Sequence, residues 1–275
     1  MNSMQLKDKL KNVSKEKNVN FNTLLRLFMY DRFIERLSVS KYKDNFILKG
    51  GFYLSTLFGV ESRSTMDIDA SFRNYPFTEE NIINMIKEII EINLNDNTTF
   101  DYNGTSPIRD EDEYGGYRIE LVAHFENIRE MFHIDIATGD PITPSAISYK
   151  YQPLLLEKVI NVWAYSIETV IAEKLSAIFT RLELSSRLRD YYDIYLIYNK
   201  EWDNLNKNNL KLAIKNTFNY RKNEIDFKSS FEIIKNSKNL HKKWKAYSKK
   251  FEYAKDISFN EILKCINNII SDLKI

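Results

Sequence analysis

The sequence is poor in the residues that build disulfides and soft-metal sites. Its 275 residues include one cysteine, Cys265, and three histidines, His124, His133 and His241. A single cysteine excludes an internal disulfide and a cysteine-based zinc site, and so few histidines argue against a histidine-rich metal site. Any bound metal would therefore need oxygen ligands.

The chain also lacks a long apolar run. No stretch approaches the roughly 18 apolar residues that cross a bilayer, and residues 1–9 contain no apolar signal-peptide core. We therefore expect a cytoplasmic protein without a membrane partner. With 43% hydrophobic residues, the chain can bury a sizeable core in one large domain or two ordinary ones.

A net charge of only +2 hides an uneven distribution. Residues 200–255 hold 15 Lys and Arg against 6 Asp and Glu, which is +9, so the rest of the chain carries −7. In one interpretation, these cations and the aromatic residues between them bind an RNA backbone and stack on unpaired bases. In the other, the aromatic residues form a helical core and the lysines its solvated face. The aromatic residues are Trp202, Phe218, Tyr220, Phe227, Phe231, Trp244, Tyr247, Phe251 and Tyr253.

Two short elements early in the chain have the composition of a nucleotide site. Asp67 and Asp69 are two residues apart on a predicted strand, so their carboxylates share a face. Like charges this close raise the pKa of one group unless a cation lies between them, and Mg2+ prefers such oxygen ligands. Gly50 and Gly51 precede a predicted helix over residues 52–58, where exposed N–H groups and the positive helix end suit a phosphate.

A third carboxylate follows on a later predicted strand. In residues 131–137, Phe132, Ile134 and Ile136 share one face, while His133 and Asp135 share the other. If this strand lies beside the first acidic strand, Asp135 becomes a further ligand for the same metal. We interpret His133 as a structural histidine and leave it out of the predicted site.

Periodicity predicts the remaining elements of an α+β fold. The expected helices cover residues 20–38, 78–94, 167–181 and 186–198, and the expected strands cover 46–49, 66–72, 117–125, 131–137 and, at an edge, 159–165. Residues 95–113 and 139–153 are predicted as polar or proline-containing connections. From residue 166 onward the pattern is helical, so we expect one domain over residues 1–165, with N-terminal helices, and a helical domain over residues 166–275.

These residues supply the parts that nucleotidyl transfer requires, which are a metal, a triphosphate cradle and an activated hydroxyl. Asp67, Asp69 and Asp135 would hold one or two Mg2+ (or Mn2+) ions, while the Gly50 and Gly51 amides would bind phosphate oxygens of an NTP. Further nucleotide contacts are expected from the hydroxyls of Ser55, Ser64 and Thr65 and from the cations Arg63, Lys174 and Arg181.

Each feature also has a purely structural interpretation. An Asp-x-Asp pair is often a solvated strand edge, and a Gly-Gly before a helix is often a tight turn. Lys174 and Arg181 would then be surface cations paired with nearby glutamates. Arg189, Asp190 and Asp193 would form a local salt-bridge cluster. The order of these features along the chain favours the nucleotide site.

Taken together, five segments resemble the nucleotidyltransferase AbiEii/AbiGii toxin family. They are Lys49-Gly50-Gly51, Arg63-Ser64-Thr65-Met66-Asp67-Ile68-Asp69, His133-Ile134-Asp135-Ile136, the stretch from Ile171 to Arg181 that contains Lys174, and Arg189-Asp190-Tyr191-Tyr192-Asp193. The resemblance covers about residues 46–198. It implies a bilobed protein with a polymerase-beta-like nucleotidyltransferase fold, a mixed sheet flanked by helices, and a helical C-terminal lobe that contributes active-site residues.

The resemblance also implies a function. Members are toxins of bacterial toxin–antitoxin or abortive-infection systems, each restrained by a cognate antitoxin protein. Characterised relatives transfer nucleotides to the 3′ acceptor end of tRNA, which blocks aminoacylation and growth. By position, the family's Ser-x-Asp element falls on Thr65 and Asp67, its essential lysine on Lys174 and its later aspartate on Asp190. We therefore expect Asp67, Asp69, Lys174 and Asp190 to be catalytic.

Two alternatives stay open. In the first, the enzyme keeps this fold and modifies a protein hydroxyl or a small molecule instead of tRNA. In the second, the protein binds nucleotide or a partner without catalysis and inhibits growth by sequestration. The basic tail beyond residue 200 carries no motif that separates them.

Overall fold

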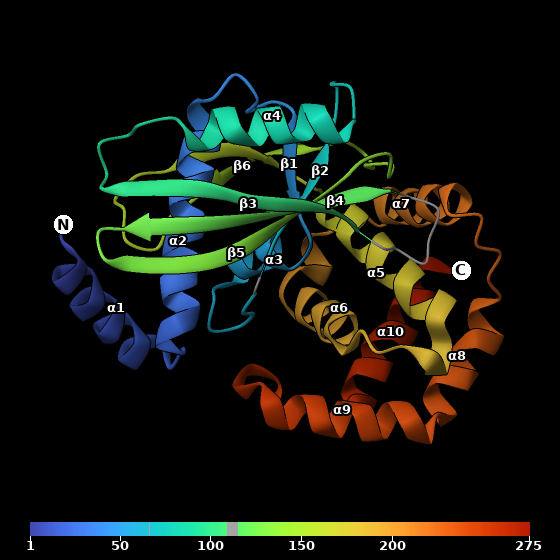
Figure 1. Cartoon of the computed structure of the whole chain (residues 1–275). Helices are drawn as coiled ribbons and strands as arrows, with labels where there is room; N and C mark the ends of the chain where they lie inside the picture. The colour runs from blue at the N-terminus through green and yellow to red at the C-terminus, as the bar shows by residue number, and fades with distance from the viewer. Residues whose placement is uncertain (66, 109–114) are drawn as a thin grey trace. The chain divides into compact units, whose positions relative to one another are not determined.

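The computed structural model describes residues 1–65, 67–108 and 115–275, which form two compact units (Figure 1). The first unit comprises Met1–Gly139 and Ile147–Ala164, and the second comprises Asp140–Ala146 and Tyr165–Ile275. The sequence did not indicate that Asp140–Ala146 belongs to the second unit. Hydrogen bonds hold it there, because Thr143 contacts the Ser166 and Thr169 hydroxyls at 2.6–2.9 Å.

Within the described residues, the first unit is built on a seven-stranded mixed sheet in the order β3-β4-β5-β2-β1-β7-β6. The central strand β2 is antiparallel to β1 and parallel to β5. The sheet and the helical second unit confirm the predicted α+β class. The strands are β1 (Phe46–Lys49), β2 (Ile68–Phe72), β3 (Thr98–Ile108), β4 (Gly116–Phe125), β5 (Ile128–Ala137), β6 (Ile147–Tyr151) and β7 (Ile160–Ala164).

Helices cover one face of this sheet. Tyr30 packs edge-on against Phe52 and against Phe132 of β5, with ring centroids 5.7 and 5.0 Å apart. Because side chains alternate along a strand, His133 and Asp135 lie on the opposite face of β5 from Phe132. The polar face is therefore the one that carries the predicted site. The helices are α1 (Ser3–Lys17), α2 (Phe21–Val39), α3 (Gly50–Phe58) and α4 (Glu79–Ile90).

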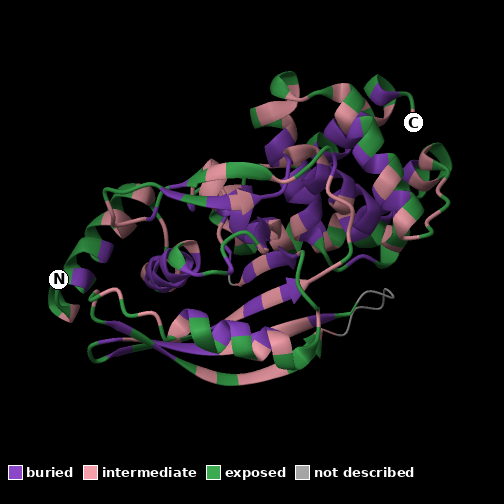
Figure 2. Ribbon diagram, turned by 90° about the horizontal axis from the view of Figure 1, so that it is seen from above, coloured by how far each residue is buried: buried purple, intermediate pink, exposed green. Residues whose placement is uncertain are grey.

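The second unit is helical throughout its described residues after Tyr165, as predicted. The Ser166 hydroxyl accepts the Thr169 N–H at the start of α5 (Ile167–Arg181). Buried residues concentrate among these helices and between the sheet and helices of the first unit (Figure 2). None of the described helices is long and apolar enough to cross a bilayer. The others are α6 (Leu188–Glu201), α7 (Lys207–Tyr220), α8 (Phe227–Asn236), α9 (Lys238–Lys250) and α10 (Phe259–Leu273), with short turns η1 (Leu182–Leu184), η2 (Trp202–Asn204) and η3 (Glu252–Ala254).

Several predicted boundaries were wrong. Strand β3 lies in the stretch predicted as a polar connection, of which residues 109–113 are outside the described part, and β6 lies in the other predicted connection. Both are edge strands with few buried side chains, so their sequences lack a hydrophobic pattern. Strand β7 is therefore internal, between β1 and β6. Helix α4 ends at Ile90, four residues before the predicted end, and Asn95 and Asn97 adopt left-handed backbone conformations between it and β3.

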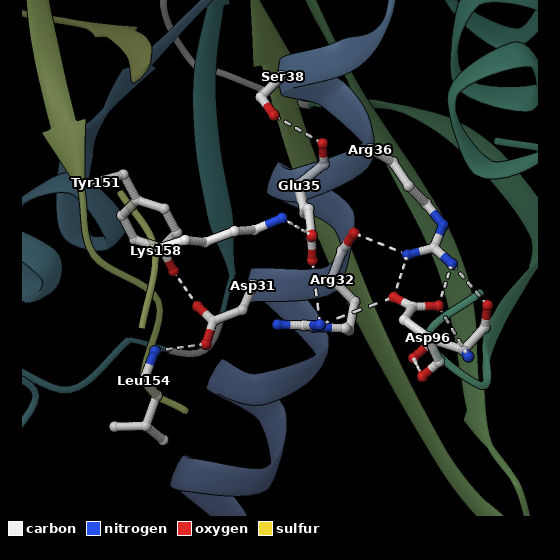
Figure 3. A network of polar contacts seen from close by, with 10 residues as sticks. Asp31, Arg32, Glu35, Arg36, Ser38, Asp96, Tyr151, Leu154 and Lys158 are labelled. Atoms are coloured by element: carbon white, nitrogen blue, oxygen red, sulfur yellow. Dashed lines mark hydrogen bonds and ion pairs between the residues drawn. The ribbon is translucent and has the colours of Figure 1, made fainter. Parts of the chain in front are cut away.

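A buried network of charged residues on α2 anchors these weakly patterned strands (Figure 3). Arg36, only 1% exposed, donates to both carboxylate oxygens of Asp96 at 2.9 and 2.8 Å and to the Thr98 carbonyl at 2.7 Å. Thr98 is the first residue of β3. The start of this strand is thus fixed by a bidentate tertiary contact.

Replacing Arg36 with alanine should lower the free energy of unfolding by about 3–5 kcal/mol, because the largely buried Asp96 carboxylate loses its bidentate partner and keeps only the longer 3.8 Å contact with Arg32. Urea unfolding followed by circular dichroism measures the loss. The control is Lys41→Ala, since Lys41 and its partner Glu88 are 67% and 49% exposed. An exposed pair of this kind contributes about 1 kcal/mol or less. Equal small losses in both variants would show that the Arg36 contacts do not stabilise the fold.

The same network ties α2 to the segment after β6. Asp31, fully buried on α2, accepts hydrogen bonds from the Tyr151 hydroxyl and from the Leu154 N–H, the latter at 2.8 Å. The Lys158 ammonium is paired with Glu35 one turn along α2. Burial raises the pKa of the Asp31 carboxyl to about 7.

This raised pKa predicts a pH dependence of stability. The folded protein binds the Asp31 proton more tightly than the unfolded chain, whose aspartates titrate near 3.8. The contribution of Asp31 is therefore fully present below that value and is lost as the pH rises towards 7, by up to about 1.4 kcal/mol per pH unit. Urea unfolding at pH 5 and pH 7.5 should show this loss in the wild type relative to Asp31→Asn, which cannot titrate. If the free energies of unfolding of the wild type and Asp31→Asn change equally with pH, the raised pKa of Asp31 is contradicted.

Candidate active site

Two of the predicted carboxylates lie side by side in the sheet. Asp69 of β2 and Asp135 of β5 are partners in the register of these parallel strands, so the condition under which Asp135 was expected to join the site is met. Asp67 is placed differently from the prediction, because β2 begins at Ile68 and Asp67 immediately precedes it. The pairing of Ile68 with Ile134 is the first in this register, so strand alternation does not fix the Asp67 side chain.

The electrostatics of Asp69 match a site that needs a cation. Burial raises the pKa of the Asp69 carboxyl to about 6, and the Asp135 and Asp67 carboxylates push it the same way. Lys49, its cross-strand partner on β1, lowers that pKa. The prediction that one carboxylate of the group has a raised pKa is confirmed, although desolvation contributes more than repulsion.

An arginine that the sequence analysis missed holds the third carboxylate. Arg118 of β4 lies opposite Asp135 and donates to both of its oxygens, at 2.8 and 2.7 Å. These hydrogen bonds raise the pKa of the Arg118 guanidinium above its ordinary value. The sequence did contain a signal for this residue. Side chains alternate along β4, so Arg118 and Glu120 share one polar face of the strand.

His133 is also part of this polar face. Its Nδ1 lies 3.5 Å from Asp67 Oδ1, and its Nε2 lies 3.4 Å from Glu120 Oε1. We had left His133 out of the predicted site, and the structure places it beside a predicted catalytic aspartate. The histidine therefore links β4 to the residue that precedes β2.

The diglycine contacts this acidic group directly. Gly50 begins α3 with a positive φ of 61°, and a Cβ there would lie 2.4 Å from Asp69 Oδ2. The Gly51 N–H, predicted to bind phosphate, donates to the same oxygen at 3.1 Å. A Cβ on Gly51 would lie 2.6 Å from Arg63 Nη2. The positive φ and the close approach of Asp69 require glycine at position 50, whereas a Cβ on Gly51 would need the Arg63 guanidinium to move.

The predicted hydroxyl residues surround the backbone of the site. Thr65 Oγ1 donates to the Asp67 carbonyl at 3.0 Å, which fixes the backbone that presents Asp67. The Ser64 carbonyl accepts a hydrogen bond from the Arg63 guanidinium. Ser55 is buried on α3, and its hydroxyl has no hydrogen-bond partner among the described residues. Phosphate binding by these hydroxyls stays a prediction.

In the second unit, Lys174 is held between two aspartates. Its Nζ lies 2.9 Å from Asp190 Oδ1 and 2.6 Å from Asp193 Oδ2. Arg187 Nε lies 3.0 Å from the other Asp190 oxygen. Lys174, Asp190 and Asp193 are all buried, so this is a desolvated ion cluster rather than a surface pair. The predicted Arg181 is the last residue of the same helix, α5.

The first unit's carboxylates fit a hard divalent cation. Within the described residues, no group of three or more His, Cys, Asp or Glu side chains is arranged to hold a metal ion. Mg2+ in nucleotide enzymes is commonly held by one or two carboxylates together with substrate phosphates, a set that Asp67 and Asp69 match. The raised pKa of Asp69 shows that positive charge beside it would be stabilising. Asp135 is ion-paired with Arg118, so its role as third ligand stays a prediction.

Two solved structures from Helicobacter pylori resemble most of this chain. JHP933 is 16% identical, with 92% of this chain and 94% of that chain covered and a TM-score of 0.55. A candidate nucleotidyltransferase is 16% identical, with 93% and 98% covered and a TM-score of 0.56. At this identity the likeness shows a shared fold. A search of curated proteins gives no match.

A protein-family model gives the more specific result. The model described as nucleotidyl transferase AbiEii toxin, type IV toxin–antitoxin system, matches residues 32–265. The matched range runs from α2 into α10 and contains the diglycine, the three carboxylates, Lys174 and Asp190. It also extends well beyond residue 198, where the resemblance in the sequence ended. The chain therefore belongs to the AbiEii nucleotidyltransferase toxin family.

Proposed function

We propose that the protein is a Mg2+-dependent nucleotidyltransferase toxin that adds nucleotides from an NTP to the 3′ acceptor end of tRNA. The observation that carries the proposal is the placement of Asp69 beside Asp135, with Gly50 and Gly51 packed on the Asp69 carboxylate. Family membership supports both the transferase activity and the existence of an antitoxin partner. Blocked aminoacylation would then explain growth arrest.

The reaction would join the 3′-hydroxyl oxygen of the acceptor to the α-phosphorus of the NTP, break the bond from that phosphorus to the β-phosphate, and release pyrophosphate and the hydroxyl proton. When bound, Mg2+ would neutralise the phosphate oxygens and orient them for in-line attack. Asp67 and Asp69 would hold it. Hydrogen bonds hold both aspartates in position before a metal binds. Thr65 fixes the backbone of Asp67, and the Gly51 N–H fixes the carboxylate of Asp69.

Two cations near these carboxylates would act on the substrate phosphates. Arg118 is 42% exposed and stays charged, so it can pair with Asp135 and still offer N–H groups to a phosphate. Arg63 lies against Gly51 at the start of α3. Charge of this kind stabilises the leaving pyrophosphate, which gains negative charge as the bond to the α-phosphorus breaks.

Lys174 and Asp190 would act as the family resemblance implies, with the lysine on the triphosphate and the aspartate orienting it. The 2.9 Å contact between Lys174 Nζ and Asp190 Oδ1 supports this orienting role. Asp193, which contacts the same Nζ at 2.6 Å, would share it. A lysine fixed by two carboxylates loses little side-chain entropy when it binds a phosphate.

Radiolabelled NTPs incubated with total RNA and with lysate protein test the acceptor. Label should enter RNA of tRNA size with the wild type and should be absent with Asp69→Asn. Label in protein alone would contradict the tRNA proposal and favour a protein hydroxyl as acceptor. Undiminished growth inhibition by both Asp67→Ala and Lys174→Ala would favour sequestration without catalysis.

A further inference from the structure

Helix α9 has an unusual distribution of charge for a surface helix. Its 13 residues include six lysines and no acidic residue. Lys238, Lys242, Lys245 and Lys249 are exposed and follow each other at helical spacing, so they form one stripe along the helix. Leu240 and Trp244 are buried on the opposite side. The helix is therefore anchored by its apolar face and presents a row of cations.

These cations have no acidic partners within the described part of the chain. None of the four stripe lysines has a described carboxylate within ion-pair distance. The lysines just outside the helix behave differently, because Lys235 is 3.3 Å from Glu232 and Lys255 is 3.3 Å from Glu252. Four unneutralised charges in a row favour a polyanion, since binding releases its condensed counterions.

Partly exposed aromatic rings follow the C-terminal end of α9. Phe251 and Tyr253 are stacked, with ring centroids 5.3 Å apart and an interplanar angle of 23°. Two cations lie over the Phe251 ring, the Arg189 guanidinium at 5.4 Å and the Lys250 ammonium at 5.6 Å from its centroid. Half-buried rings flanked by cations are suited to stacking on unpaired bases.

The stripe and rings are attached to the helix that carries Asp190. Lys243 of α9 donates to the Ser185 carbonyl at 2.8 Å, just before α6. In the short turn η3 that follows α9, Tyr253 packs against Tyr192 of α6 with ring centroids 4.7 Å apart. A polyanion on α9 would therefore lie on the same compact unit as the Lys174 cluster.

We propose that the α9 surface, defined as the four stripe lysines with Phe251 and Tyr253, binds the RNA acceptor. The lysines would contact backbone phosphates, and the two rings would stack on unpaired bases. The inference rests on the proposed function, because it assigns a surface to the RNA of that reaction. An acidic protein would use the lysines alone, whereas RNA uses both the lysines and the rings.

RNA binding at graded salt concentrations tests the proposal. One variant combines Lys238→Gln, Lys242→Gln, Lys245→Gln and Lys249→Gln. The charge-matched control combines Lys7→Gln, Lys9→Gln, Lys11→Gln and Lys15→Gln, all exposed on α1. Fluorescence anisotropy with purified tRNA should show that the slope of log K against log salt falls by about 3 in the α9 variant, because about four phosphate contacts are lost. The control should keep the wild-type slope.

The rings are tested with a short unpaired RNA oligonucleotide. Phe251→Leu combined with Tyr253→Leu should weaken binding about 5- to 100-fold and leave the salt slope unchanged, since stacking releases few counterions. Circular dichroism melts that overlap with the wild type would show that every variant is folded.

Three outcomes would overturn the inference. They are an unchanged salt slope in the α9 variant, equal losses in the α9 and α1 variants, and loss of antitoxin binding with intact RNA binding. Failure of the wild type to extend any RNA would instead overturn the proposed function, because binding at α9 is measured without turnover. The two failures are thus distinguishable.

Discussion

Nucleotidyl transfer by the Asp69→Asn variant is expected to fall at least about 10³-fold, a loss of about 4 kcal/mol in transition-state stabilisation. Asparagine keeps the size of the side chain and a hydrogen-bond acceptor for the Gly51 N–H. It removes the negative charge that would hold the metal. The loss should therefore appear in the chemical step of a protein that is still folded.

Stability measurements separate this loss from unfolding. Because burial raises the pKa of Asp69 from 3.8 to about 6, the folded protein loses stability as the pH rises between these values, and the loss is complete above about pH 6. The thermal midpoint of Asp69→Asn at pH 8 should accordingly equal or exceed that of the wild type, and the difference should disappear at about pH 4. Asp101→Asn is the matched control, since Asp101 is an exposed strand residue whose side chain is 71% accessible. If Asp69→Asn transfers nucleotides as fast as Asp101→Asn, Asp69 is not a catalytic residue.

Lys174→Met should both abolish transfer and lower the free energy of unfolding by about 3–5 kcal/mol. The substitution leaves Asp190 and Asp193 buried side by side without the ammonium that joins them. Urea unfolding measures the loss of stability. Lys11→Met is the control, because Lys11 pairs with Asp8 on an exposed face and should change stability by about 1 kcal/mol or less.

A double variant separates the catalytic role of Lys174 from its structural role. Lys174→Met combined with Asp193→Asn removes one buried charge of each sign, so much of the lost stability should return. Transfer should stay abolished if the Lys174 ammonium acts on the triphosphate. Transfer that returns together with stability would mean that Lys174, Asp190 and Asp193 form only a local salt-bridge cluster.

Elements with strong local signals could be predicted from the sequence alone. The helix over residues 167–181 was predicted from the Ser166 cap and the apolar spacing behind it, and the structure agrees. The strand over residues 46–49 was also predicted from local sequence alone, and the structure contains it. The order of the diglycine, the paired aspartates and the later aspartate could likewise be recognised without knowing which strands are neighbours. Such signals are local because capping and side-chain alternation depend on neighbouring residues.

Features that depend on which strands are neighbours could not be predicted in this way. Arg118 and His133 belong to the site because β4, β5 and β2 lie next to one another, and no local pattern encodes that register. Strand β3 has little pattern of its own and is fixed by Arg36, which lies 62 residues before Thr98. Tertiary contacts of this kind override local propensity.

Sequencing of tRNA 3′ ends tests the proposed function most directly. Cells that express the wild-type protein should accumulate tRNAs with extra nucleotides beyond the acceptor end, and cells that express Asp69→Asn at the same level should not. Growth arrest by the wild type with every tRNA 3′ end unchanged would contradict the proposal that this site modifies tRNA.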